Sequence, residues 1–273
     1  TSIGNKAFSY CSNLQSIVIT TSVTSIGDSA FSNCCNLQSI TIPASVTSIV
    51  DSAFSNCSNL QSIVIPTSVT SIGPYAFSHC SSLHSITIPA NVTSIGNSAF
   101  SYCSNLQSIT IPASVTSIGK SAFYSCRELK SIDVHFNNLH YSSIEGILYT
   151  KNAETLLCFP ISHHLIYFTI PSSVSTIGDY AFFQCYNLSS IKIPASVTSI
   201  GDSAFSNCYN LLSIAIPTSV TSIGDSPFSS CGQLISINVD FHNLHYSSID
   251  GILFTKNCET LLCFPASHDL SHF

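Results

Sequence analysis

Phenylalanine recurs with a strict period of 23 residues through the first half of the chain. The six positions are Phe8, Phe31, Phe54, Phe77, Phe100 and Phe123. Nearly the same stretch surrounds each of them, A-F-S-N-C-S-N-L-Q-S-I-V-I-P-T-S-V-T-S-I-G-D with small changes. Self-similarity at a period of roughly 20–50 residues indicates a solenoid, in which each unit packs on its neighbours.

Each unit divides into two apolar segments and a turn. The pattern L-x-x-I-x-I, which begins at Leu14, predicts a strand whose alternate residues point inward. Proline follows in most units, as at Pro43, and ends the strand because it has no N–H donor. The piece S-V-T-S-I predicts a second inward pair. Gly27 suits a turn with positive φ, and Asp28 is placed to N-cap a short helical turn over D-S-A-F-S-N-C.

This unit resembles a leucine-rich repeat, and more narrowly the BspA-like subfamily, whose unit runs roughly A-F-x-x-C-x-x-L-x-x-I-x-I-P-x-x-V-x-x-I-G. The match recurs about ten times and covers nearly the whole chain. The resemblance implies a mostly β leucine-rich-repeat solenoid of the α/β horseshoe type. A parallel sheet would line its concave side, and turns or 3₁₀ segments its convex side.

The period breaks in two long units, residues 132–168 and 237–273, which are identical at 27 of 37 positions. Both contain H-Y-S-S-I-(E/D)-G-I-L-(Y/F)-T-K-N, in which alternating apolar residues and an E/D-G turn predict a small hairpin. BspA-like arrays carry a similar insertion. We expect residues 1–273 to form a single solenoid that is a segment of a longer array, with open ends that favour end-to-end self-association.

Charge argues against two classes of partner. Charged residues make up only 7% of the chain, against roughly 25% in an average soluble protein. The net charge is −6, and the seven Lys and Arg residues are scattered singly. Without a basic stripe we expect no binding to nucleic acid and no membrane contact by this segment.

Nine of the 13 cysteines share one register of the repeat. A disulfide framework and a metal ladder are both conceivable. However, zinc sites need Cys pairs a few residues apart, and parallel Cβ vectors suit a disulfide poorly. We therefore favour a buried column of free thiols.

Two further rows of side chains invite a metal-binding interpretation. Eight of the ten histidines lie in the long units, and an Asp row follows the turn glycines. The histidine spacing matches no metal motif, so surface imidazoles are favoured. N-capping explains the Asp row without Ca²⁺, and the row is interrupted by Pro74, Asn97 and Lys120. We predict no metal and no cofactor.

Catalytic motifs are absent: the chain has no G-x-S-x-G, H-E-x-x-H, phosphate loop or G-x-G-x-x-G. Serine is abundant because the repeat contains it many times. We therefore expect no enzymatic activity, and a hydrolase remains a remote alternative.

The outward strand positions indicate where a partner would bind. The first half of the concave sheet is neutral and rich in hydroxyl groups, whereas the second half is more apolar and aromatic and begins at the first hairpin. An apolar patch with a polar rim is typical of a protein-binding site. The candidate partner-binding residues are Tyr167, Thr169, Lys192, Leu212, Ile235, His140 and Tyr141.

We interpret the chain as a non-enzymatic adhesion or recognition module of a secreted or cell-surface protein. The BspA-like resemblance implies host or matrix proteins, or host cells, as partners. Two alternatives stay open: a structural spacer with no ligand of its own, and binding of glycans or ice by the Ser/Thr columns.

Overall fold

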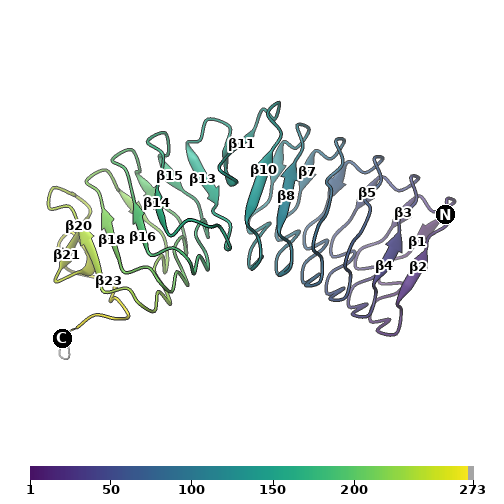
Figure 1. Ribbon diagram of the computed structural model, residues 1–273, viewed down its shortest axis with the longest axis horizontal. Coiled ribbons are helices and arrows are strands. Elements are labelled where there is room, and N and C mark those ends of the chain that lie inside the picture. Colours follow the sequence, from purple (N-terminus) through teal and green to yellow (C-terminus); the bar gives the residue numbers. More distant parts are fainter. Residues whose placement is uncertain (270–273) are drawn as a thin grey trace. The chain divides into compact units, whose positions relative to one another are not determined.

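The computed structural model describes residues 1–269, which belong to two compact units, 1–146 and 147–273 (Figure 1). The last residues of the second long unit, Leu270 to Phe273, lie outside the described residues. In each unit the strands of successive coils lie side by side, as expected for a solenoid (Figure 1). The fold is a mostly β leucine-rich-repeat solenoid with parallel sheets, and the described residues contain no helix.

Unit 1 is built from short strands. They are β1 (Ser2–Ile3), β2 (Ser16–Val18), β3 (Ser25–Ile26), β4 (Ser39–Thr41), β5 (Ser48–Ile49), β6 (Ser71–Ile72), β7 (Ser94–Ile95), β8 (Ser108–Ile111), β9 (Ser117–Ile118), β10 (Ser131–Val134) and β11 (Tyr141–Ile144). The S-I pieces pair as β1-β3 and β5-β6-β7-β9, and the L-x-x-I-x-I pieces pair as β2-β4 and β8-β10. All these pairs are in register at 23 residues, so equivalent side chains form columns.

Unit 2 repeats this arrangement. Its strands are β12 (Ile147–Thr150), β13 (Thr155–Cys158), β14 (Tyr167–Thr169), β15 (Thr176–Ile177), β16 (Ser190–Lys192), β17 (Ser199–Ile200), β18 (Ser213–Ile216), β19 (Ser222–Ile223), β20 (Ser236–Val239), β21 (Tyr246–Ile249), β22 (Ile252–Thr255) and β23 (Leu261–Cys263). Strands β14, β16, β18 and β20 form one parallel sheet. The two-residue strands β15, β17 and β19 form a second row, which begins at β13.

Inward alternation is confirmed in every coil, but the strand pairing is not uniform. In the third and fourth coils the L-x-x-I-x-I segment forms no strand, and an isolated bridge between Thr41 and Val64 takes its place. Ile63 and Ile65 are nonetheless buried there, each at 6% exposure or less. Burial of alternate residues therefore holds these segments in place without a continuous ladder.

Successive turns, rather than helical segments, form the side opposite the strands, so the expected helical turn over D-S-A-F-S-N-C is wrong. In the second coil Ser29 and Asn33 have φ of 54° and 61°. Between them, Phe31 donates its N–H to Ala53 of the next coil at 2.9 Å. Asp28 caps no helix. In equivalent positions Asp202 N–H donates to Asp179 Oδ1 at 3.1 Å, so this row links neighbouring coils.

The glycines after the S-I strands serve close packing and not positive φ, which corrects the second sequence expectation. Positive φ occurs only at Gly146 and Gly251 among the glycines of the described chain. A Cβ atom on Gly73 would lie 2.7 Å from the backbone carbon of Val50, and one on Gly201 would lie 2.6 Å from Asp179 N. Coils thus approach here more closely than any side chain allows.

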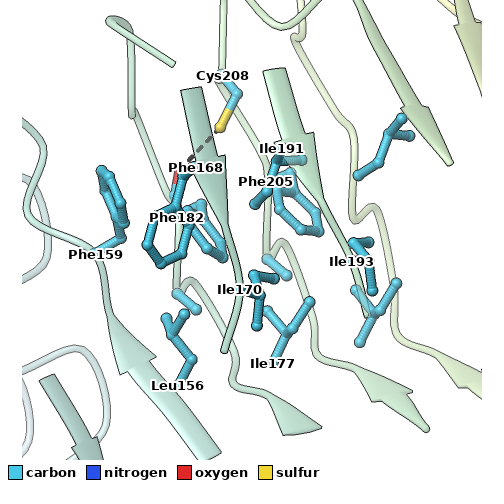
Figure 2. Packing of buried hydrophobic residues seen from close by; sticks show 14 of the residues in the cluster. Leu156, Phe159, Phe168, Ile170, Ile177, Phe182, Ile191, Ile193, Phe205 and Cys208 are labelled. Carbon is cyan, nitrogen blue, oxygen red and sulfur yellow. Dashed lines mark hydrogen bonds between the residues drawn. The ribbon is translucent and has the colours of Figure 1, made fainter. Parts of the chain in front are cut away.

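The core is a stack of side chains that repeats along each unit. Phe31, Phe54, Phe77 and Phe100 are completely buried, and adjacent rings lie 5.5–5.6 Å apart and nearly parallel. In unit 2 Phe182 and Phe205 stack in the same way at 5.0 Å, with Ile and Leu side chains around them (Figure 2). Strict repetition of the sequence therefore appears in space as continuous aromatic and aliphatic columns.

The hairpin predicted for the long units is confirmed in the second copy. Strands β21 and β22 pair antiparallel around Asp250 and Gly251, whose φ values are 50° and 82°. Two consecutive positive φ values are the mark of a type I′ turn, which suits Asp-Gly. Strand β23 then pairs antiparallel with β22. In unit 1 the matching Glu145 and Gly146 have φ of 53° and 79°.

Candidate binding surface

The outward side of the sheet β14-β16-β18-β20, together with the residue before each strand, forms what we call the strand face of unit 2. Inward residues such as Phe168 and Ile191 are buried at 9% exposure or less, so the residues between them point to solvent. Tyr167 is 73% exposed, and Leu212 and Ile235 are 46% and 49% exposed.

The parallel register decides which of the candidate residues are neighbours. Thr169 pairs with Lys192 on the adjacent strand. Ile235 N–H donates to Leu212 O at 2.9 Å, which places these two on consecutive coils. Ser189 N–H likewise donates to Ile166 O at 2.9 Å, so Ile166 stands in the same column, next to Tyr167 in sequence. The fold therefore brings five of the seven candidates onto one surface.

The strand face of unit 1 has a different chemical character. Its equivalent column holds exposed Gln15, Gln38, Gln61, His84, Gln107 and Lys130. Val18 and Val64 are exceptions, at 76% and 79% exposure. Unit 2 carries four large apolar side chains in the corresponding region, so the contrast between the two halves of the chain is confirmed at the level of exposed side chains.

The remaining candidates, His140 and Tyr141, lie in unit 1. His140 is exposed. Tyr141 is half-buried, and its hydroxyl accepts a hydrogen bond of 2.8 Å from Ile118 N–H. Tyr246 makes the same bond to Ile223 N–H at 2.9 Å in unit 2. This tyrosine position therefore has a structural role in both copies of the long unit.

The cysteine column lies inside both units. All 13 cysteines are free thiols, and eight of the nine in the repeated register are buried, Cys11 being exposed. Each buried thiol donates to a phenylalanine carbonyl 26 residues earlier, as from Cys208 to Phe182 O at 3.0 Å (Figure 2). Burial raises the pKa of the Cys80 thiol to about 12. Neutral, hydrogen-bonded thiols of this kind are poor nucleophiles.

Histidine and aspartate do not assemble into a metal centre within residues 1–269, where no three His, Cys, Asp or Glu side chains converge. Most histidines of the long units are exposed, as expected. His163 differs, because it is 1% exposed and packs 4.8 Å from the ring of Phe159. The expected surface position is therefore wrong for His163, and His272 lies outside the described residues. The described part of the chain also holds no helix with the length and hydropathy of a membrane span.

Comparison with known proteins agrees with this architecture. The family model for the BspA-type leucine-rich repeat region matches six copies over residues 1–146 and 157–270. No curated protein sequence matched the chain.

Solved structures resemble both the sequence and the fold. A leucine-rich repeat protein from Eubacterium ventriosum is 34% identical with a TM-score of 0.74, over 82% of this chain and 60% of its own. A leucine-rich cell surface protein from Faecalibacterium prausnitzii is 31% identical with a TM-score of 0.69, over 87% of this chain and 76% of its own. The pneumococcal vaccine antigen PcpA, at 24% identity, covers 89% of this chain and 68% of its own, and shares the fold with a TM-score of 0.77.

This chain spans 60% of the length of the Eubacterium protein, so it corresponds to part of that relative. The residues that the family model matches, 1–146 and 157–270, include the coils in register and the hairpin of β21 and β22. The chain is a member of the BspA-type leucine-rich repeat family.

Proposed function

We propose that the chain is a non-enzymatic protein-binding module of a cell-surface or secreted protein, and that its strand face in unit 2 contacts host or matrix proteins or cells. The observation that carries this proposal is the exposed apolar group Ile166, Tyr167, Leu212 and Ile235 on one sheet. The name of the Faecalibacterium relative, a cell surface protein, supports the location.

The stability of the fold does not explain why these exposed positions hold apolar side chains. The inward positions of the same strands already fill the core, and the unit 1 column shows that glutamine suits the outward position equally well. A large aromatic or aliphatic side chain contributes about 1.5–3 kcal/mol when a partner buries it completely. Thr169 and Lys192 supply polar groups at the edge of this group, which is the usual composition of a protein interface.

Binding to immobilised matrix proteins tests the proposal. The triple variant Tyr167→Asp, Leu212→Asp, Ile235→Asp is compared with the parent chain by biolayer interferometry, after circular dichroism has shown that both fold alike. The matched control carries Val18→Asp and Val64→Asp, which change exposed apolar residues on the strand face of unit 1. We expect the triple variant to lose binding and the control to keep it.

The spacer alternative makes the opposite prediction. If the triple variant binds as well as the parent chain, or if neither binds more than an unrelated solenoid, the strand face of unit 2 is no partner site. Serine columns such as Ser190, Ser213 and Ser236 stand in register and motivate binding of ice or glycans as a second candidate. Thermal-hysteresis measurements and a glycan array would reveal that activity.

A further inference from the structure

A separate open groove of about 580 Å³ runs along the turn side of unit 1. One wall is formed by the last αL residue of successive turns, including Asn56, His79 and Tyr102. The other wall holds residues two positions later in the same coils, including Ser58 and Ser81. The groove therefore crosses several coils. Arg127 lines one end of its residue range, and no Asp or Glu is among the lining residues.

Bulky aromatic residues stand in this wall at a backbone conformation that disfavours them. Tyr10 and Tyr102 have φ of 63° and 58°, a region in which asparagine and histidine, the type of His79 at 60°, are tolerated better. Asn33 and Asn56 fill the same register in the coils between them. Packing of the core does not account for the tyrosines, because they are 75% and 41% exposed. His79 is exposed as well, so the aromatic side chains of this register lie at the surface of the groove.

The rings form amphipathic surfaces in the groove. His79 and Tyr102 stack with centroids 4.2 Å apart and planes within 10° of each other. Tyr124 meets Tyr102 edge-on at 5.5 Å. The rings are thus supported by neighbours and held in one orientation, which reduces the entropy lost when a ligand packs against them.

The opposite wall presents hydrogen-bond acceptors. Ser58 Oγ donates to Cys35 O at 3.3 Å, and Ser81 Oγ donates to Ser58 O at 3.2 Å. Their remaining lone pairs suit a ligand that donates hydrogen bonds. Sugar hydroxyl groups do so, whereas sulfate and phosphate groups only accept.

The period of the groove also favours one kind of polymer. The Phe54, Phe77 and Phe100 rings of these coils are spaced 5.5–5.6 Å apart, so wall groups recur at about that interval. An extended peptide advances about 3.3 Å per residue and about 6.6 Å per repeat of side-chain direction, so neither interval matches one coil. A pyranose ring with its linkage has a length close to one coil spacing. We propose that the groove binds a linear, neutral glycan with one sugar ring per coil.

Titration calorimetry of the intact chain tests this assignment with three probes: a β-1,4-linked glucose hexasaccharide, a β-1,4-linked N-acetylglucosamine hexasaccharide and a heparin-derived hexasaccharide. The variant His79→Asn, Tyr102→Asn installs the residue that the repeat itself uses at this register, so the backbone turn is retained. The matched control is Tyr75→Ser, which removes an αL tyrosine (φ 53°, 48% exposed) outside the groove and restores the repeat's own serine.

We expect saturable binding of at least one neutral hexasaccharide, weakened about tenfold or more in the double Asn variant and unchanged in the control. Absence of binding to both neutral probes, an unchanged affinity in the double Asn variant, or stronger binding of the heparin probe would each overturn the proposal. The Tyr167, Leu212 and Ile235 variant of unit 2 should bind the glycan like the parent chain. A failure of the strand-face proposal is therefore distinguishable from a failure of this one.

Discussion

Asn138 forms hydrogen bonds between the first long unit and the preceding coil, so its replacement should lower the stability of the fold. The residue is completely buried. Its Nδ2 group donates to Pro112 O at 2.8 Å and to Val115 O at 2.9 Å, and its Oδ1 accepts from the N–H groups of His140 and Tyr141, both at 2.8 Å. Asn243 makes the same four bonds in unit 2.

The expected magnitude follows from the groups left without a partner. Pro112 O also accepts from Val115 N–H, at 3.3 Å, so it keeps a partner when Asn138 is replaced by alanine. The other three groups lose theirs, at about 1 kcal/mol or more each. We therefore expect Asn138→Ala to lower the free energy of unfolding by about 3 kcal/mol. In ordinary coils a serine hydroxyl fills part of this role, as from Ser114 to Val92 O at 2.5 Å.

Urea unfolding followed by circular dichroism measures the loss, and hydrogen exchange of the His140 and Tyr141 amides localises it. Exchange is needed because long repeat arrays depart from two-state unfolding. Asn137→Ala, at an exposed neighbour, is the control. A loss below about 0.5 kcal/mol, or amide exchange as slow as in the parent chain, would refute the reasoning, since surface changes have effects of that size.

Four further outcomes are expected. Gly96→Ala should destabilise the chain by about 1–3 kcal/mol, because its Cβ would lie 2.5 Å from the backbone of the preceding coil. Gly4→Ala should not, because no atom lies within 4 Å of its Cβ position. Thermal unfolding of the two variants compares these effects. Cys35 should react with an aromatic disulfide reagent in the native state and Cys80 only after unfolding. Between the unfolded thiol pKa of 9.0 and the native value of about 12 at Cys80, the native state keeps a proton that the unfolded chain releases; stability, measured by urea titration, should therefore fall as pH rises above 9. Tyr246→Phe should cost about 1 kcal/mol in the same assay, because the backbone N–H of β19 loses its 2.9 Å acceptor.

The repeat made some positions predictable and left others open. Inward and outward faces follow from alternation, and the I′ hairpin follows from Asp250-Gly251, because both depend on local spacing. The roles expected for the turn glycines and for the aspartates that follow them are wrong, since a glycine or aspartate in a turn has several local uses. Only the distance to the next coil shows that Gly73 serves close approach and that Asp179 accepts a bond from that coil.

The candidate surfaces were likewise predictable only in part from the sequence. The outward positions of Tyr167, Leu212 and Ile235 could be read from the strand pattern, and the register then made Leu212 and Ile235 neighbours. The groove at His79 and Tyr102 was missed. Its signal in the sequence is the replacement of asparagine by aromatic residues at one register, which carries meaning only once that register is known to have positive φ.

By itself, the 23-residue period determined the solenoid, its coil length and which side chains enter the core, because identical units bury the same side chains against the same neighbours in each coil. The tertiary structure decided how neighbouring coils are joined: through backbone bonds between turns, glycines at close approach and asparagine side chains such as Asn138. These contacts link residues 22 to 26 positions apart, as from Phe31 to Ala53 and from Asn138 to Pro112, and their distances exist only after the coils have stacked.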